Sequence, residues 1–129
     1  MAAGVRKEQP TYFAWLGVTQ YISEAAATTT LSLAGRHAAG SEIVFDVIVP
    51  FEDLSADEFQ ISAAARASSE ERGEPWISFY RLKEITSRLL ALGFGSVQPL
   101  APEDARQYYF GQPAGVTPLM AWQLISAVV

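Results

Sequence analysis

Hydrophobic residues gather in two short runs near the start of the chain, Tyr12–Val18 and Ile43–Val49. The segment between them opens at Ser23, a favourable N-cap, and closes near Gly35, a residue type common at the C′ position of helices. Apolar runs that are rich in β-branched and aromatic residues and joined through a helix are typical of parallel strands in an α/β sheet. The pattern therefore predicts a strand, a helix and a second parallel strand over Thr11–Pro50.

The carboxyl ends of these two strands are where we expect a ligand site, because open α/β sheets bind ligands there. The ends lie around Thr19–Tyr21 and Asp46–Pro50. Asp46 is the most unusual residue, since a carboxylate inside an apolar strand is costly to bury without a partner. It either orients a substrate, acts as a base with a pKa raised by desolvation, or accepts hydrogen bonds from a neighbouring loop.

A helix with a thin apolar face follows the second strand. Ser55 and Glu58 have the spacing of a capping box, which predicts a helix from about 56 to 72. Its apolar residues are few, and its carboxyl end, SSEERGE, is polar and expected to be solvated. We interpret the segment 51–75 as a helical insertion or lid.

The last third of the chain predicts a core helix and two strands. The helix, Arg81–Leu92, is clearly amphipathic and leads into a strand over Phe94–Leu100. A short helix over 102–109 and a final strand over Leu119–Val129 follow. No long crossover helix separates the two strands, so we expect them to pair antiparallel, with the apolar final strand at the centre of the sheet.

Length and composition restrict the class of protein. The 129 residues, half of them apolar, predict a single domain over 1–129 with a short tail over 1–10. A net charge of −5 argues against nucleic-acid binding. Without cysteine and with His37 as the lone histidine, neither a disulfide nor a metal site is expected. No apolar run reaches the roughly 18 residues of a membrane span, which predicts no membrane association and a cytoplasmic location.

Several segments, taken in order, resemble a known family. They are GVRKEQPTYFAWLGVTQYIS, GSEIVFDVIVP, RGEPWISFY with the later LLALGF, and the closing LMAWQLISAVV. Together they are similar to the carboxyl-terminal half of the leucine carboxyl methyltransferase-like group. These are class I S-adenosylmethionine-dependent O-methyltransferases, common in bacteria. The resemblance runs from about Ala2 to the end, and it implies a partial Rossmann-like sheet of about four strands with the last one antiparallel.

The resemblance leaves part of the family pattern without a counterpart. The first three strands of the family are missing, and with them the glycine-rich loop and the acidic residue that hold the cofactor. Many relatives also have a glutamate just before the glycine of the motif in the family's fourth strand, where this chain has Leu16. S-adenosyl-L-methionine is therefore the cofactor by resemblance only, and we do not expect this chain alone to bind it.

The resemblance also indicates candidate site residues at the strand ends. Leu16 and Gly17 would lie at the cofactor edge, and Tyr21, Asp46 and Trp76 in the substrate pocket. Each has a structural alternative: the first two pack locally, Tyr21 packs against the following helix, and Trp76 anchors its loop in the core. No residue is assigned a catalytic role.

The handedness of the crossovers predicts which face of the sheet is left uncovered and so available for association. Parallel crossovers are right-handed, so the helices over 24–34 and 81–92 should cover the same face of the sheet. The opposite face and the flank of Tyr12–Val18 would then expose more apolar surface than monomers tolerate. We expect a homodimer or a complementary subunit. The possible functions are a methyltransferase-like protein inactive alone, a non-catalytic dimerising or partner-binding domain, and an intact ligand-binding module.

Overall fold

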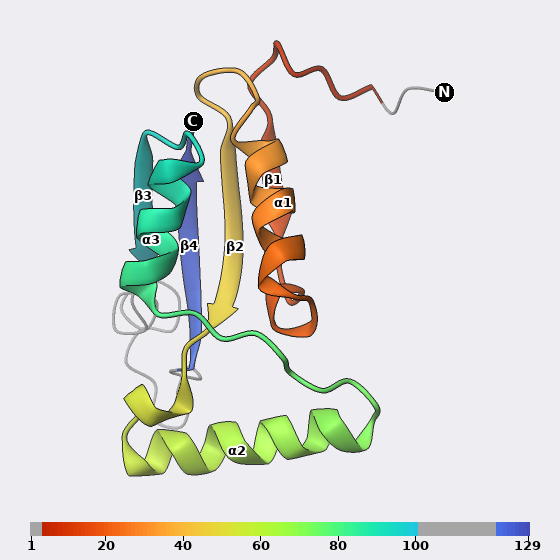
Figure 1. Ribbon diagram of the computed structural model, residues 1–129, viewed down its shortest axis with the longest axis vertical. Coiled ribbons are helices and arrows are strands. Elements are labelled where there is room, and N and C mark those ends of the chain that lie inside the picture. Colours follow the sequence, from red (N-terminus) through yellow and green to blue (C-terminus); the bar gives the residue numbers. More distant parts are fainter. Residues whose placement is uncertain (1–3, 101–120) are drawn as a thin grey trace, which may run out of the picture.

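The computed structural model describes residues 4–100 and 121–129, in which four strands form one mixed sheet of order β1-β2-β4-β3 (Figure 1). β1 and β2 are parallel, whereas β4 runs antiparallel to both of its neighbours. The strands are β1 (Tyr12–Trp15), β2 (Glu42–Ile48), β3 (Ser96–Leu100) and β4 (Trp122–Val128). The predicted fold class, the antiparallel last pair and the central final strand are confirmed.

β1 is shorter than predicted. It ends at Trp15, and the backbone of Gly17 has a φ of +71°, a left-handed conformation that ends the extended ladder. The apolar residues that follow Trp15 therefore belong to the loop that leads into the short 3-10 turn η1 (Thr19–Tyr21). The predicted short helix over 102–109 lies outside the described residues.

Helices α1 (Glu24–Ala34) and α3 (Leu82–Ala91) cover the same face of the sheet (Figure 1), as the crossover handedness predicts. Their apolar residues pack on alternate residues of the two central strands, which point to one face. Among the described residues, the largest fully buried apolar side chains include Leu31, Phe45, Ile85, Leu89 and Ile125. No described helix covers the opposite face of the sheet.

The structure confirms the predicted start of α1 but not the predicted backbone conformation at its end. Ser23 is the N-cap, and its hydroxyl accepts a hydrogen bond from the N–H of Ala26 over 3.2 Å. Gly35 is the C-cap but has a right-handed φ of −66°, so the expected left-handed C′ glycine is wrong. A Cβ at Gly35 would lie 2.8 Å from the carbonyl oxygen of Leu92, so the close approach of the α3 end explains the glycine.

Helix α2 (Ala56–Glu71) lies across the carboxyl ends of β1 and β2 (Figure 1), after the 3-10 turn η2 (Phe51–Asp53). Both hydrogen bonds of its predicted capping box are present, at 3.0 and 3.4 Å between Ser55 and Glu58. Only Ser62 and Ser69 are fully buried along its length. The polar carboxyl end is therefore not wholly solvated as expected, because Ser69 faces inward. That α2 acts as a lid stays a prediction.

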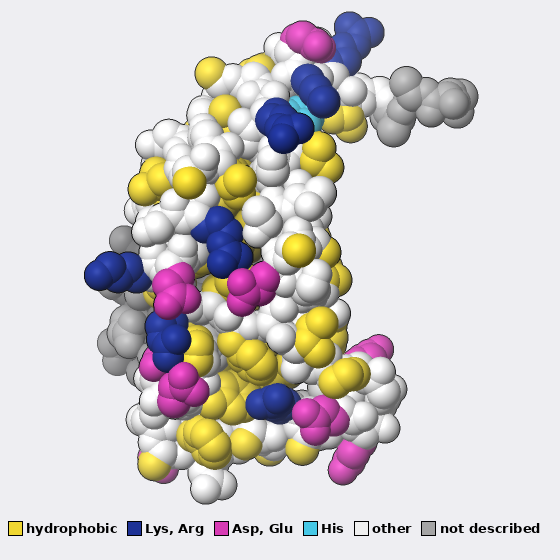
Figure 2. Space-filling view, viewed as in Figure 1, with side chains coloured by type: hydrophobic (Ala, Val, Ile, Leu, Met, Phe, Trp, Pro, Cys, Tyr) yellow, Lys and Arg dark blue, Asp and Glu magenta, His cyan; other side chains and the backbone are white. Residues whose placement is uncertain are grey.

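The outer edge of β1 is open within the described residues, since β2 is its only neighbour there. The N–H of Glu42 donates to the carbonyl of Thr11, which fixes the side of β1 that faces β2. Because backbone groups alternate along a strand, Tyr12 and Ala14 point their N–H and C=O groups outward. Hydrophobic side chains line this side of the molecule, with basic residues toward the amino-terminal end (Figure 2). None of the described helices is long and apolar enough to cross a bilayer.

Candidate functional site

The loop after β1 is fastened to β2 at the carboxyl ends of the two strands. The N–H of Gly17 donates to Oδ1 of Asp46 over 2.8 Å. The hydroxyl of Thr19 donates to the carbonyl oxygen of the same aspartate, also over 2.8 Å. These two bonds hold the candidate cofactor-edge glycine against the candidate pocket carboxylate, as the parallel strand pair predicts.

Asp46 is the polar group of β2 best suited to proton transfer. Burial raises the pKa of its carboxyl, and the hydrogen bond from the Gly17 N–H opposes that rise only in part. Its side chain is half-buried, on the sheet face opposite the one covered by α1 and α3. A carboxyl group with a raised pKa at a strand end can orient a polar ligand or take part in proton transfer.

The segment that carries Trp76 crosses the η1 turn. The N–H groups of Ile77 and Ser78 both donate to the carbonyl of Gln20, over 2.7 and 3.3 Å. The hydroxyl of Ser78 also donates to the carbonyl of Ile22. These long-range bonds place Trp76 beside Tyr21, although 55 residues separate the two in sequence.

The hydroxyl of Tyr21 lies among polar side chains, and its hydrogen-bond role can be assigned. Ser69 Oγ donates its proton to the carbonyl of Glu74 over 2.6 Å. The Tyr21 hydroxyl, 3.4 Å from Ser69 Oγ, is therefore the donor of that pair. The side chains of Ser69, Trp76 and Gln20 lower the pKa of this hydroxyl through hydrogen bonds to it.

Two polar atoms beside Tyr21 are buried, Oε1 of Gln20 and Nε1 of Trp76, and neither makes a hydrogen bond of good geometry. The two residues are 4% and 5% exposed. Trp76 could be singled out from its sequence context, whereas Gln20 and Ser69 could not. A polar residue next to a strand end was the only available signal for Gln20, and Ser69 lies in a stretch expected to be solvated.

Trp76 is also part of an aromatic cluster beneath α2. Its ring meets Trp122 edge to face with centroids 4.9 Å apart, and Phe51 at 6.2 Å. The guanidinium of Arg66 lies 5.2 Å from the ring centroid of Phe79 in the same cluster. Trp76 therefore anchors its loop in the core, as the structural alternative for this residue predicts. It also lies beside the Tyr21 hydroxyl.

Leu16 and Gly17 form an open edge. Leu16 is 55% exposed, and a Cβ at Gly17 would meet no atom within 4 Å. Space is therefore available for a ligand against this backbone. Among the described residues, however, this turn between β1 and α1 contains a single glycine and is not a glycine-rich loop. No described strand lies on the outer side of β1, so no acidic residue at the end of such a strand is present to hold the cofactor. The residues present do not fit a complete S-adenosylmethionine site.

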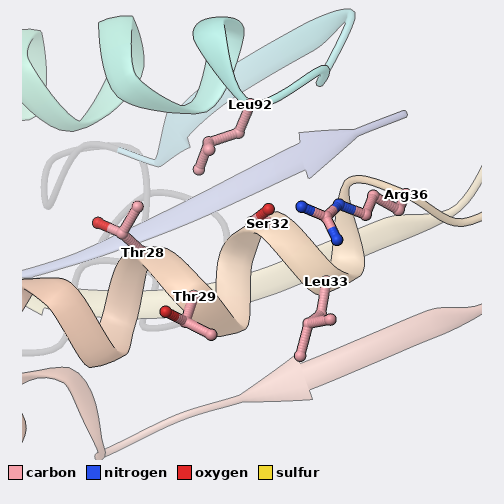
Figure 3. A pocket seen from close by; sticks show the side chains of 6 residues that line it. All are labelled: Thr28, Thr29, Ser32, Leu33, Arg36 and Leu92. Atoms are coloured by element: carbon pink, nitrogen blue, oxygen red, sulfur yellow. The ribbon is translucent and has the colours of Figure 1, made fainter.

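A hollow of about 250 Å³ lies between α1 and the end of α3 (Figure 3). Five of its lining residues come from α1 and the turn after it, and Leu92 comes from the end of α3. Hydroxyl groups and the Arg36 side chain line it, without a carboxylate or an unpaired buried atom. We assign it no role.

No protein-family model matches the sequence, and no curated protein is significantly similar to it. Solved structures, in contrast, share its architecture. A possible exported protein from Bordetella parapertussis matches 95% of this chain with a TM-score of 0.60 at 11% identity. A putative O-methyltransferase from Nostoc punctiforme matches 95% with a TM-score of 0.55 at 14% identity. The chain shares the arrangement of its Rossmann-like sheet and helices with these structures.

A third structure supports the same assignment of fold. It is an S-adenosylmethionine-dependent methyltransferase, a possible histamine N-methyltransferase, from Thermotoga maritima. It matches 95% of this chain with a TM-score of 0.53 at 12% identity. This chain spans 39%, 33% and 59% of the three matched chains, in the order given. The methyltransferase-like fold is therefore present only in part.

Proposed function

We propose that this chain is the carboxyl-terminal, acceptor-side half of an S-adenosylmethionine-dependent O-methyltransferase of the leucine carboxyl methyltransferase-like kind. The observation that carries the proposal is the position of β4, antiparallel between β2 and β3, in a fold shared with the putative O-methyltransferase and the S-adenosylmethionine-dependent methyltransferase described above. The rest of the cofactor site belongs to another polypeptide segment. When bound, S-adenosylmethionine would supply the methyl group.

The residues of this chain contribute binding and proton transfer. Leu16 and Gly17 present open backbone toward the cofactor side, while Tyr21 and Trp76 position the methyl acceptor. Asp46 accepts the proton that the acceptor releases, and its bond to the Gly17 N–H fixes the orientation of the carboxylate. Burial favours this role, because it raises the pKa of the carboxyl above its usual value and so makes the carboxylate a stronger base.

The complementary segment docks along the open edge of β1. The outward N–H and C=O groups of Tyr12 and Ala14 offer main-chain hydrogen bonds to an added strand. Side chains around this edge are apolar, and they form a groove of about 390 Å³ between β1 and α1 that includes Phe13, Leu33 and His37. A strand added here would lie directly beside Leu16 and Gly17, where the cofactor site needs completion.

Methyl transfer from labelled S-adenosylmethionine tests this proposal. The chain would be assayed alone and after co-expression with a candidate segment that carries the glycine-rich loop. Transfer is expected only from the pair, and Asp46→Asn should reduce it by about 10²-fold as loss of a general base. Transfer by the chain alone, or none by a stably formed pair, would contradict the proposal.

A non-catalytic dimerising domain is the second candidate. It is favoured by the exposed apolar side chains along the β1 side, since Tyr12, Leu16 and Leu33 are each about half exposed or more. Light scattering after gel filtration distinguishes the two. A stable dimer that the charge-introducing change Ala14→Lys dissociates, and that never binds a glycine-loop segment, would favour the second candidate.

A further inference from the structure

Cations gather at the amino-terminal end of the open edge of β1. Arg6 and Lys7 come from the segment before the strand, and Arg36 comes from the turn after α1. The N–H of Ala38 donates to the carbonyl oxygen of Lys7 over 2.8 Å, so the two segments lie side by side. Figure 2 shows Lys and Arg side chains beside the single histidine at this end. Three positive charges are thus concentrated at one end of a chain whose net charge is −5.

These three cations have no partner within the described part of the chain. None of them makes an ion pair or a side-chain hydrogen bond there, whereas Arg66, Arg81 and Arg88 each pair with a carboxylate. Glu8, the acidic residue of the same segment, can balance one of the three charges. The carboxylate of Glu42, at the start of β2, already accepts a hydrogen bond from a serine of β4. An excess of positive charge therefore remains for a partner to neutralise.

The groove beside these cations is apolar and has an open backbone edge. Phe13 and Leu33 line it, and the ring of His37 meets that of Phe13 edge to face with centroids 4.9 Å apart. The Nδ1–H of His37 donates to the carbonyl of Leu33 over 3.0 Å, which holds the ring in place. Tyr12 alternates with Phe13 along β1, and its side chain is 64% exposed. A strand added to this edge would therefore meet apolar side chains on both of its faces.

Apolar surface beside unpaired cations predicts the chemistry of the segment that covers both. Apolar side chains would fill the groove, and carboxylates at one end of the same segment would neutralise the cations. We propose that the segment docking on β1 is a strand with acidic residues at the end beside Lys7 and Arg36 and apolar residues along the groove; this assignment rests on the proposed function. The acidic end fixes the direction and register of the strand, because reversal or slippage moves its carboxylates away from the cations.

A second copy of this chain is a poorer match for the same edge. Residues 5–18, which include β1 and both of its flanks, contain Arg6, Lys7 and a single acidic residue, Glu8. Pairing of β1 with itself therefore brings no excess of negative charge to the cations. In a parallel pairing, the cations of the two copies would also lie together and repel. Charge thus favours a different, acidic polypeptide over a homodimer at this edge.

Titration of the isotope-labelled chain with short peptides tests the inference by NMR, without cofactor or methyl transfer. Two peptides share a core of alternating threonine and valine and carry three glutamates either before or after it. In their controls, glutamines replace the glutamates. One of the acidic peptides should move the outward amide signals of Tyr12 and Ala14 downfield and saturably. At low salt it should bind about tenfold more tightly than its glutamine control, and salt of about 0.5 M should remove most of this preference.

Charge variants identify the cations responsible. Lys7→Gln combined with Arg36→Gln should remove most of the preference for the acidic peptide. Lys83→Gln, at an exposed cation of α3 away from β1, should leave it unchanged. Equal binding of the acidic and glutamine peptides, or Tyr12 and Ala14 signals that no peptide moves, would overturn the inference.

Two further outcomes are decisive. A preference for the acidic peptide that survives the loss of Lys7 and Arg36 would also overturn the inference. So would Tyr12 and Ala14 signals that move with the concentration of the chain alone, since a second copy would then occupy the edge. The comparison of peptides on the wild-type chain holds even if a variant fails to fold. Methyl transfer by the reconstituted pair tests the proposed function separately, so either can fail alone.

Discussion

The N–H of Gly17 donates to Oδ1 of Asp46 over 2.8 Å and so joins the loop after β1 to β2. The bond has two structural requirements. Gly17 must adopt a left-handed backbone, with a φ of +71°, and Asp46 must keep an acceptor oxygen on the less covered face of the sheet. The geometry of the strand-end site therefore depends on two residues that are 29 positions apart, and each requirement can be tested.

Two substitutions of Asp46 should distinguish the effect of its hydrogen-bond acceptor on stability from the effect of its charge. Asp46→Ala removes the partner of the Gly17 N–H and should lower the free energy of unfolding by about 1 kcal/mol at pH 7. Asp46→Asn keeps an acceptor oxygen and avoids burying a charge, so it should be at least as stable as the wild type. Urea denaturation measures both, and equal stability of the two variants would contradict the hydrogen bond.

The pH dependence of stability should carry the signature of Asp46. Burial raises the pKa of this carboxyl in the folded state, so the folded state binds its proton more tightly than the unfolded state. Its contribution is fully present below the unfolded pKa, about 4, and is lost as pH rises through the folded pKa. The free energy of unfolding of the wild type minus that of Asp46→Asn should therefore fall as pH rises from about 4. A flat or rising difference contradicts the raised pKa.

Two glycines should resist substitution for different reasons. Gly17→Ala places a side chain in a left-handed backbone with open space around it, at a cost of about 1–2 kcal/mol. Gly35→Ala has no such strain, but its Cβ would meet the Leu92 carbonyl oxygen at 2.8 Å, at a cost of about 1–3 kcal/mol. Asparagine, which tolerates the left-handed region, should partly rescue position 17 and not position 35. Thermal unfolding of the four variants decides, and rescue at both positions would contradict this distinction.

Helix α2 should open more readily than α3. Only Ser62 and Ser69 are fully buried along α2, whereas Ile85 and Leu89 anchor α3 in the core. Amide hydrogen exchange should therefore be faster in α2, and Ser55→Ala should increase it further by removing a cap worth about 1 kcal/mol. Ser87→Ala, on the exposed side of α3, is the matched control. Equal protection of the two helices would argue against an opening role for α2.

The elements that the sequence predicts well are those fixed by local chemistry or by the handedness of connections. The Ser55–Glu58 capping box forms with both bonds, and the missing crossover helix correctly indicates an antiparallel last pair. The length of β1 was overestimated, because the pattern of apolar residues continues through Val18 while the left-handed Gly17 ends the strand. Periodicity does not encode that backbone conformation.

The candidate site was only partly predictable. A carboxylate in an apolar strand indicates Asp46, but nothing local identifies Gly17 as its partner. Gln20 is buried, and the N–H groups of Ile77 and Ser78, from a segment more than 50 residues away, bind its backbone carbonyl. Such long-range contacts leave no periodic signal in the sequence, and so the polar atoms beside Tyr21 become visible only in the fold.

Calorimetric titration with S-adenosylmethionine tests the central claim most directly, namely that this chain holds one side of a methyltransferase site and needs a further segment to bind the cofactor. The chain alone should give no binding heat at micromolar concentrations. The same titration after addition of a segment carrying the glycine-rich loop should give saturable, one-to-one binding. Micromolar binding of S-adenosylmethionine by the chain alone would contradict the account.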